Sequence, residues 1–280
     1  MSNPAFSNMP AFTDRTLTQQ ELEELYRQPA AQKGVERAVR TAQAGGPMPT
    51  MGSVMGGSAT PMTYENTIQK TAALFGVLLL AAVVGWNIPL LALPGALVGL
   101  GLALVIAFKK QISVPLFFAY AVAEGLFVGG ISGIFNAQWA GIVFQAVLGT
   151  LIVFGVTLAL FRSGKIRASA KMNKIALIAL IGYAVFSLVN FGLMMFGVID
   201  DPWGLRGVQV FGIPLGVIIG VFAIGLAAYC LVMDFDFIQR GVENQLDQKY
   251  GWMGAYGLLV TLVWLYLEIL RLLAILRGNE

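Results

Sequence analysis

Long apolar stretches alternate with short polar segments from about residue 69 to the end of this 280-residue chain. Each stretch is close to the ~20 residues that an α-helix needs to cross the ~30 Å hydrocarbon core of a bilayer. Seven such stretches are predicted to be helices, over residues 69–88, 90–108, 113–135, 139–161, 175–197, 211–237 and 253–276. The apolar runs are continuous, whereas the strands of a transmembrane β-barrel alternate in hydrophobicity. The pattern therefore predicts an all-α polytopic membrane protein with seven transmembrane helices.

Positive charges gather in alternate connections between these stretches. Residues 162–174, between the fourth and fifth stretches, contain five Lys and Arg, whereas the next connection contains one. Because Lys and Arg accumulate in loops on the cytoplasmic side, this asymmetry predicts a cytoplasmic N-terminus and a C-terminus on the far side. We expect a multi-pass protein of the cell membrane, such as a bacterial inner or plasma membrane.

The first part of the chain differs from the rest. Residues 1–65 are polar and rich in Pro, Gly, Met and Ser, and residues 44–61 have the composition of a flexible linker. No apolar core follows the start, so no cleavable signal peptide is expected. We predict a disordered cytoplasmic tail over residues 1–65 and a seven-helix membrane domain over residues 66–280.

The composition excludes several kinds of chemistry. The chain has no His and a single Cys, Cys230, which removes the usual zinc and haem ligands and any disulfide within the chain. No glycine-rich phosphate-binding loop and no nucleophile elbow is present. The net charge of +3 is ordinary for a membrane protein and does not indicate nucleic acid. We expect no cofactor and no enzymatic activity, and any response to pH must come from carboxylates.

Four acids lie within or at the ends of the apolar stretches, and one cation joins them: Glu124, Asp234, Asp236, Glu268 and Arg271. An ionisable side chain at membrane depth costs several kcal/mol by insertion scales, so it indicates a functional site. Asp236 is two residues from Asp234, so the two face different sides of a helix, and Asp236 also fits a solvated helix end. Glu124 also fits a hydrogen-bonded structural carboxyl. Glu268 and Arg271 are spaced i, i+3 and can touch on one helix face.

Asp234 and Glu268 are the favoured functional pair. If the sixth and seventh helices form an antiparallel hairpin, these residues lie opposite each other when the turn is centred near Gly251. Two carboxyls in a low-dielectric site do not both ionise easily, so they would share a proton at neutral pH. When ionised they would separate and bind calcium weakly and transiently, with Arg271, Glu124 and Asp236 as modulating residues.

Small residues and short connections predict how some helices pack. Gly125, Gly129 and Gly133 form one stripe on the third helix, where neighbours can approach closely, so this helix is expected to be buried. The first two helices are joined only by residues 87–89, which predicts a tight antiparallel hairpin.

Three segments resemble a known family. LVMDFDFIQ, with Asp234, resembles the acid-bearing end of the sixth helix of the Bax inhibitor family, including its bacterial YccA-like members. YLEILRLLAIL, with Glu268, resembles the seventh helix, and AYAVAEGLFVGGIS, with Glu124, resembles the third. The resemblance covers about residues 65–277 and implies a Bax-inhibitor-like bundle around a central, acid-bearing seventh helix.

The resemblance also implies a function. Bacterial members look like pH-sensitive calcium leak channels closed by two acids on helices 6 and 7, and Asp234 and Glu268 occupy those motif positions. This chain differs from the family pattern in two respects. The acid on the seventh helix is Glu where Asp is usual, and the segment between the two acids looks longer.

The leading hypothesis is thus a cation leak pathway whose permeant ion is calcium, with protons and the lipid bilayer as its other partners. One alternative is a scaffold that modulates other membrane proteins, such as quality-control proteases. Another is an intramembrane aspartyl protease, which also needs two acids on adjacent helices. The chain has no Gly-x-Gly-Asp motif for that activity.

Overall fold

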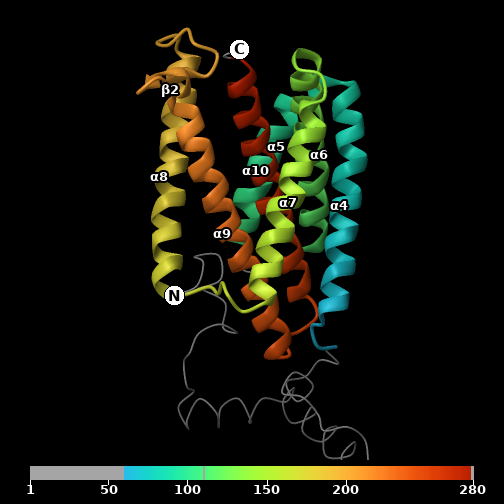
Figure 1. Ribbon diagram of the computed structural model, residues 1–280. Helices are drawn as coiled ribbons and strands as arrows, with labels where there is room; N and C mark the ends of the chain where they lie inside the picture. The colour runs from blue at the N-terminus through green and yellow to red at the C-terminus, as the bar shows by residue number, and fades with distance from the viewer. Residues whose placement is uncertain (1–59, 110, 279–280) are drawn as a thin grey trace, which may run out of the picture.

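The computed structural model describes residues 60–109 and 111–278, which are almost entirely helical (Figure 1). The spanning elements are α4 (Tyr64–Asn87), η2 with α5 (Pro89–Leu91 and Ala92–Phe108), α6 (Val114–Gln138), α7 (Ile142–Arg162), α8 (Ala170–Met195), α9 (Leu215–Glu243) and α10 (Tyr250–Arg277). Seven helices in this part of the chain are long and apolar enough to cross a bilayer. The predicted number and order of helices is confirmed.

Polar caps explain why two helices begin earlier than hydropathy predicts. Thr63 caps α4, with its hydroxyl accepting a 3.2 Å hydrogen bond from the backbone N–H of Asn66. Ser169 caps α8 in the same way, with a 3.3 Å bond from the N–H of Met172. Such caps satisfy backbone donors that the first helical turn leaves free. The first turns are polar, so an apolar window does not include them.

The predicted glycine stripe on α6 packs against α4. A Cβ atom at Gly125, Gly129 and Gly133 would lie 2.3, 2.0 and 3.1 Å from the main-chain oxygens of Leu78, Ala82 and Trp86. The two backbones are therefore in direct contact along several turns, which only residues without a Cβ allow. The expected burial of this helix holds, since α6 is among the more buried spans.

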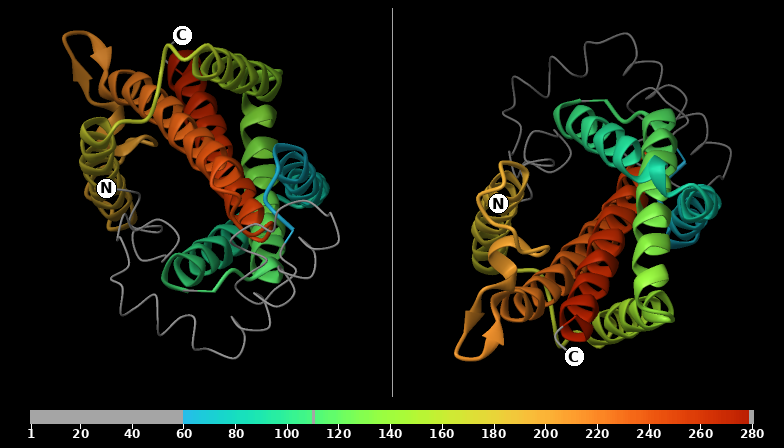
Figure 2. Two further views of the ribbon diagram at one scale, coloured as in Figure 1. Left: turned by 90° about the horizontal axis from the view of Figure 1, so that it is seen from below. Right: turned by 90° about the horizontal axis from the view of Figure 1, so that it is seen from above.

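The prediction of a tight hairpin between the first two helices is wrong in its packing. The connection is short, as expected, with Ile88 between α4 and η2. However, α4 and α5 both pack on α6, which lies between them (Figure 2). The small residues of α6 allow the backbones of both neighbouring helices to pack closely against it. On the α5 side, a Cβ at Gly95 would lie 2.8 Å from the carbonyl oxygen of Ala123.

α10 occupies the centre of the bundle and packs on α4, α6, α7 and α9. It is the most buried of the seven spans, which confirms a central seventh helix. α9 runs antiparallel beside it, and the two are joined by residues 244–249 (Figure 2).

α8 is the most exposed span and packs on α9 and on the short helix η3 (Gly204–Gly207). Only Ala176 and Asn190 are buried along its length. After η3 the chain forms a small hairpin of β1 (Gln209–Val210) and β2 (Ile213–Pro214) before α9 begins. The sixth helix was predicted to start at residue 211, but residues 211–214 belong to this hairpin and α9 begins at Leu215.

Residues 60–62 pair with the connection between α9 and α10. Pro61 forms an isolated antiparallel bridge with Asp247, and the N–H of Met62 donates a 2.7 Å hydrogen bond to Leu246. Met62 is buried against Gly241. Packed contacts are therefore present at residues 60–62, before the predicted domain start at 66. The tail predicted over residues 1–65 lies outside the described residues as far as residue 59.

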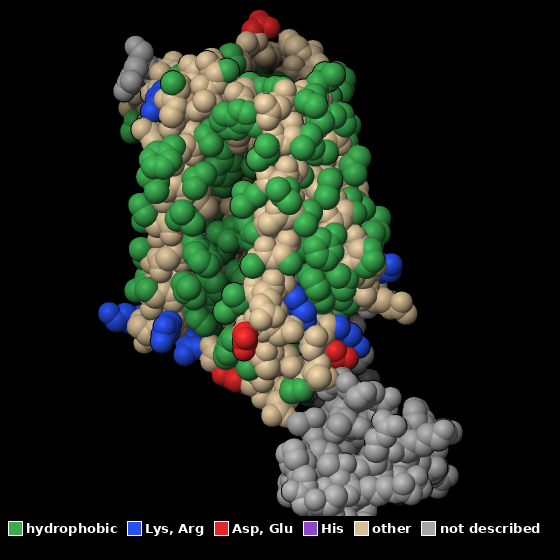
Figure 3. All heavy atoms as spheres, turned by 90° about the vertical axis from the view of Figure 1, so that its right-hand side faces the viewer, with side chains coloured by type: hydrophobic (Ala, Val, Ile, Leu, Met, Phe, Trp, Pro, Cys, Tyr) green, Lys and Arg blue, Asp and Glu red, His purple; other side chains and the backbone are tan. Residues whose placement is uncertain are grey.

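The two ends of the bundle differ in charge. The end that holds the start of α4, the connection 163–169 and the α9–α10 turn carries most of the Lys and Arg visible in Figure 3. We call it the basic end, and the positive-inside rule assigns it to the cytoplasm. The end of α10, η3 and the β-hairpin lie at the opposite end (Figure 1).

Candidate functional site

Asp234 lies opposite Thr261, and the predicted register of α9 and α10 is wrong. The Thr261 hydroxyl donates a 2.6 Å hydrogen bond to Asp234 Oδ2. Asp234 Oδ1 lies 2.9 Å from where a Cβ at Gly257 would be. Both contacts centre the turn near residues 245–248 instead of Gly251, because α9 extends to Glu243 and α10 begins at Tyr250.

This register separates the two acids that were predicted to form a pair. Glu268 is seven residues beyond Thr261 on α10. Seven residues of α-helix are about two turns, or roughly 10 Å along the axis. Asp234 thus lies in the half of the bundle nearer the basic end and Glu268 in the other half. The arrangement does not fit an aspartyl protease, in which two carboxyls must share one catalytic water.

Glu268 is buried among cations and a tyrosine. Its residue is 1% exposed, and its carboxylate pairs with Arg271, three residues later on the same helix face. The predicted contact between these two residues is confirmed. Oε1 also accepts a hydrogen bond from the Tyr183 hydroxyl of α8.

Arg206 of η3 is the second cation at Glu268, and sequence reasoning missed it. Its Nη1 lies 3.6 Å from Glu268 Oε2, and both side chains are almost fully buried. Its Nη2 donates to Tyr183 Oη at 2.9 Å and to Ser187 Oγ at 3.3 Å. One signal was available. Arg206 is the single Lys or Arg in a connection that the positive-inside rule leaves nearly free of cations.

Aromatic rings complete the surroundings of Arg206. The guanidinium carbon lies 5.4 Å from the ring centroid of Tyr183 and 5.6 Å from that of Phe186. Rings at this distance attract a cation through their negative faces, most strongly where water is excluded. Tyr183 also packs against Trp264 of α10, with centroids 5.6 Å apart.

The Tyr183 hydroxyl connects all the charges of this cluster. It donates to Glu268 and accepts from Arg206 Nη2, and Arg271 Nη1 donates to it at 3.2 Å. With Glu268 ionised, the cluster of Arg206, Arg271 and Glu268 holds two positive charges and one negative charge. In this conformation the Glu268 carboxylate faces guanidinium groups on both oxygens and offers no free site to a cation.

Two buried atoms of the cluster lack a hydrogen bond. Arg206 Nη1 and Glu268 Oε2 face each other, but neither has a hydrogen-bond partner among the described residues. A separation of 3.6 Å exceeds the length of a hydrogen bond, so the pair is electrostatic only. Buried charges are normally both paired and hydrogen-bonded, so this contact is incomplete.

Asp236 and Glu124 lie apart from this cluster. Asp236 forms a 2.9 Å ion pair with Arg240 one turn later, near the basic end, and Arg240 is exposed. The Asp236 side chain is only 18% exposed and α9 continues to Glu243, so Asp236 forms an ion pair within the helix and is not the solvated helix end that was expected. Glu124 lies one turn after Tyr120 on α6, and its carboxylate lies against Gly99 of α5. This position inside the bundle fits a structural carboxyl, and among the described residues no hydrogen bond or ion pair joins Glu124 to Asp234 or Glu268.

The described residues contain no group of three or more Cys, His, Asp or Glu that could hold a metal. Asp234 and Glu268 cannot share one ion in this arrangement, so the predicted joint calcium site is not assembled. Asp234 and Thr261 place three side-chain oxygens together, which is fewer than the six to eight that calcium prefers.

A groove of about 600 Å³ lies on the lipid-facing side of the bundle. Its walls come from α4, α6 and α7, and Leu262, Val263 and Tyr266 of α10 form its floor. Figure 3 shows the hollow between α7 on the left and α4 in the centre. The lining is apolar apart from a few groups such as Ser132 and Tyr266, whose hydroxyls are 2.6 Å apart.

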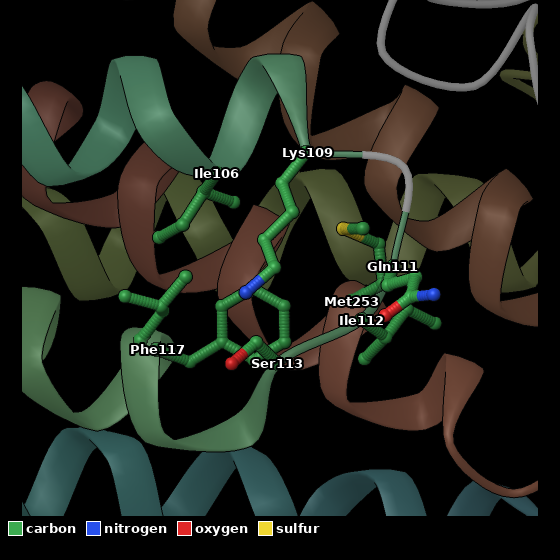
Figure 4. A pocket seen from close by; sticks show the side chains of 8 residues that line it. Ile106, Lys109, Gln111, Ile112, Ser113, Phe117 and Met253 are labelled. Carbon is green, nitrogen blue, oxygen red and sulfur yellow. The ribbon is translucent and has the colours of Figure 1, made fainter.

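A second depression lies at the basic end, where the α5–α6 connection meets Met253 of α10. In Figure 4 the Lys109 side chain extends across it toward Ser113 and Phe117. Its volume is about 10 Å³, which is room for a single water molecule and excludes it as a ligand site.

Comparison with known protein families gives a match over nearly the whole chain. The sequence model of the family described as Bax inhibitor 1 like matches residues 3–278. No curated protein matches the chain closely enough to report.

Proposed function

Because this chain belongs to the Bax inhibitor 1 like family, we propose that it is a leak pathway for cations across a bacterial cell membrane, with calcium as the main permeant ion. The conformation described here is a closed one. Helix α10 carries the essential acid, and helix α9 carries a second acid nearer the cytoplasm. The protein needs no cofactor for this activity, since the ion is the transported species.

One observation carries this proposal: an acid that is 1% exposed lies deep in the most buried transmembrane helix. A charge at membrane depth is costly and is found mostly on ion pathways and proton relays. Here the cost is offset by two arginines and a tyrosine, which also had to be buried. A bundle that needed only to pack would be at least as stable with apolar residues at these positions.

In this proposal Asp234 and Glu268 form two separate ion-binding sites along the pathway. A cation entering from the opposite end meets the Glu268 cluster, whose excess positive charge repels it. A cation entering from the basic end meets Asp234 and Thr261, which bind it weakly. Conduction requires Glu268 to release one arginine partner, so that both Asp234 and Glu268 present a carboxylate oxygen to the ion. Weak binding at each suits conduction, because an ion must leave as readily as it enters.

The alternative function is a scaffold that modulates other membrane proteins, such as quality-control proteases. The groove of about 600 Å³ favours it, because it opens toward the lipid and could seat a transmembrane helix of a partner. A scaffold requires no ion flux.

Calcium flux into proteoliposomes tests the proposal. Wild-type protein should conduct calcium down its gradient, and Asp234→Asn should reduce that flux because it removes the negative charge that binds the ion nearer the basic end. Glu243→Gln is the matched control: it also neutralises an acid on α9, but at an exposed position in the last turn. Flux equal to that of protein-free liposomes would overturn the proposal and favour the scaffold. Equal loss in Asp234→Asn and Glu243→Gln would remove Asp234 from the pathway.

A further inference from the structure

We propose that Arg206 is the detachable counter-charge of Glu268: its contact holds the pathway closed, and its withdrawal toward the extracytoplasmic loop opens it. This inference rests on the proposed function, because it names the residue that regulates that pathway. It follows from how the two arginines of the cluster are attached to the fold.

Arg271 cannot be separated from Glu268 by movement of helices. Both residues lie on α10, one turn apart, so a rigid-body movement of any helix carries them together. Arg206 belongs to η3, in the connection between α8 and α9. Movement of η3 or α8 relative to α10 changes the Arg206–Glu268 distance and leaves the Arg271 contact intact. Only the first contact can respond to a change of helix packing.

The side chain of Arg206 is held mainly by α8. Its hydrogen bonds go to Tyr183 and Ser187, and its stacking partners are Tyr183 and Phe186, all on α8. The backbone of η3 is tied to the same helix, since Asn190 Oδ1 accepts a 2.7 Å bond from the N–H of Leu205. α8 and Arg206 thus form one unit, which meets α10 at the Glu268 carboxylate and, through Tyr183, at Arg271 and Trp264.

The attachment of this unit to the rest of the bundle is light. α8 is the least buried span, and apart from the Glu268 cluster its polar contacts with α9 lie at its other end, where Tyr229 donates a 2.6 Å bond to Asn173. Gly216 at the start of α9 has no side chain, so η3 packs directly on it, and a Cβ there would lie 3.0 Å from the carbonyl oxygen of Arg206. Movement of η3 away from α9 opens this backbone contact. A hinge near Asn173 would let the opposite end of α8 move outward.

The contact between Arg206 and Glu268 is electrostatic only and lacks a hydrogen bond, so less is lost when the two groups separate. Arg206 Nη1 and Glu268 Oε2 are 3.6 Å apart and neither is hydrogen-bonded among the described residues. Arg206 keeps all of its hydrogen bonds to α8 when it leaves Glu268. Departure also takes one positive charge from the cluster, which removes the barrier to cations and frees one carboxylate oxygen.

The test compares two variants that remove the same charge. Arg206→Gln and Arg271→Gln each delete one cation from Glu268. Only the first removes the ion pair between η3 and α10, whereas the second removes a hydrogen bond from Arg271 to Tyr183; the Tyr183–Glu268 hydrogen bond remains in both. Spin labels at Leu188→Cys on α8 and Leu276→Cys on α10, both exposed positions, report the distance between these helices in a Cys230→Ala background. Arg206→Gln should lengthen and broaden this distance distribution, whereas Arg271→Gln should leave it close to that of the parent.

Calcium flux gives the second readout. Arg206→Gln should raise flux roughly tenfold, which corresponds to about 1.4 kcal/mol in the balance of open and closed states. Arg271→Gln should raise it less. If Arg206→Gln does not fold, Arg206→Lys provides the same test, because a lysine keeps the charge but loses the forked contacts with Tyr183 and Ser187. It should give a smaller change of the same sign.

The spin-label distance tests the role of Arg206, and calcium flux tests the channel. A changed distance without flux in any variant supports Arg206 as the tie between α8 and α10 and overturns the channel. Flux in the wild type with an unchanged distance in Arg206→Gln overturns the role of Arg206 and leaves the channel standing. Equal effects of the two arginine variants on distance and flux would mean that only charge matters, which also overturns the inference.

Discussion

The Arg206 guanidinium lies 3.6 Å from the Glu268 carboxylate, and both side chains are at most 5% exposed. The first residue comes from a connection between helices and the second from the centre of the bundle. A charge pair in this position cannot be read from either segment alone. The two charges are costly to bury, and removal of either partner leaves the other charge without its counter-charge.

Loss of Glu268 should destabilise the protein more than loss of an exposed acid. Glu268→Ala leaves Arg206, which is 4% exposed, without its counter-charge. Removing one partner of a buried pair typically costs about 3–5 kcal/mol. Thermal unfolding in detergent should show a clearly lower midpoint than the parent, whereas Glu243→Gln should change little. Similar midpoints for the two variants would contradict a buried ionic cluster.

Asp234 should be coupled to Thr261 and not to Glu268. Asp234→Asn combined with Thr261→Val should show non-additive stability effects of about 0.5–3 kcal/mol, because the two side chains share a hydrogen bond. Asp234→Asn combined with Glu268→Gln should be additive within about 0.5 kcal/mol, as for separate sites. Strong coupling of the two acids would restore the proton-sharing pair that the sequence suggested.

The close contact between α6 and α4 should not tolerate a methyl group. A Cβ at Gly129 would lie 2.0 Å from the carbonyl oxygen of Ala82, so Gly129→Ala should force the helices apart at a cost of about 1–3 kcal/mol. Gly101→Ala on α5 meets nothing within 4 Å and should be neutral or slightly stabilising. The effect of each variant is measured by the yield of monodisperse protein and by its unfolding temperature. Equal behaviour of the two variants would show that α4 and α6 do not touch here.

Residues 60–62 should stabilise the α9–α10 turn. A chain that begins at Thr60 keeps the bonds to Leu246 and Gln248, whereas one that begins at Tyr64 loses them together with buried Met62. Met62→Ala alone should cost about 2–5 kcal/mol, the usual range for a buried Met. Hydrogen exchange of residues 244–249 should be faster in the shorter chain and in Met62→Ala. Unchanged exchange would mean that this pairing does not hold the turn.

Cysteine labelling should place the basic end in the cytoplasm. A cysteine at Lys165 should react from the cytoplasmic side only, and one at Phe211, the fully exposed tip of the β-hairpin, from the other side. Position 204 is a poor choice for this label, because Gly204 has φ +61° and its Cβ would meet Asn190. Labelling of both from one side would contradict the seven-span topology.

Several features of this protein are decided by the sequence alone. The seven helices follow from hydropathy, because a bilayer forces each apolar run of sufficient length to satisfy its backbone as a helix. The contact of Glu268 with Arg271 follows from i, i+3 spacing, and the glycine stripe of α6 from small residues at i, i+4 spacing. All of these are set within one helix, whose geometry is fixed by its 3.6-residue period.

The tertiary structure decides what depends on two segments at once. The register of α9 against α10 rests on where each helix ends, and a few residues at the turn move Asp234 from Glu268 to Thr261. The placement of α6 between α4 and α5 depends on competing helix faces, which hydropathy treats as equivalent. Arg206 reaches Glu268 only because η3 lies over the end of the bundle, where Tyr183 and Phe186 of α8 can hold its charge. An ion pair across elements depends on distances of a few ångström, and the period of a single helix carries no information about them.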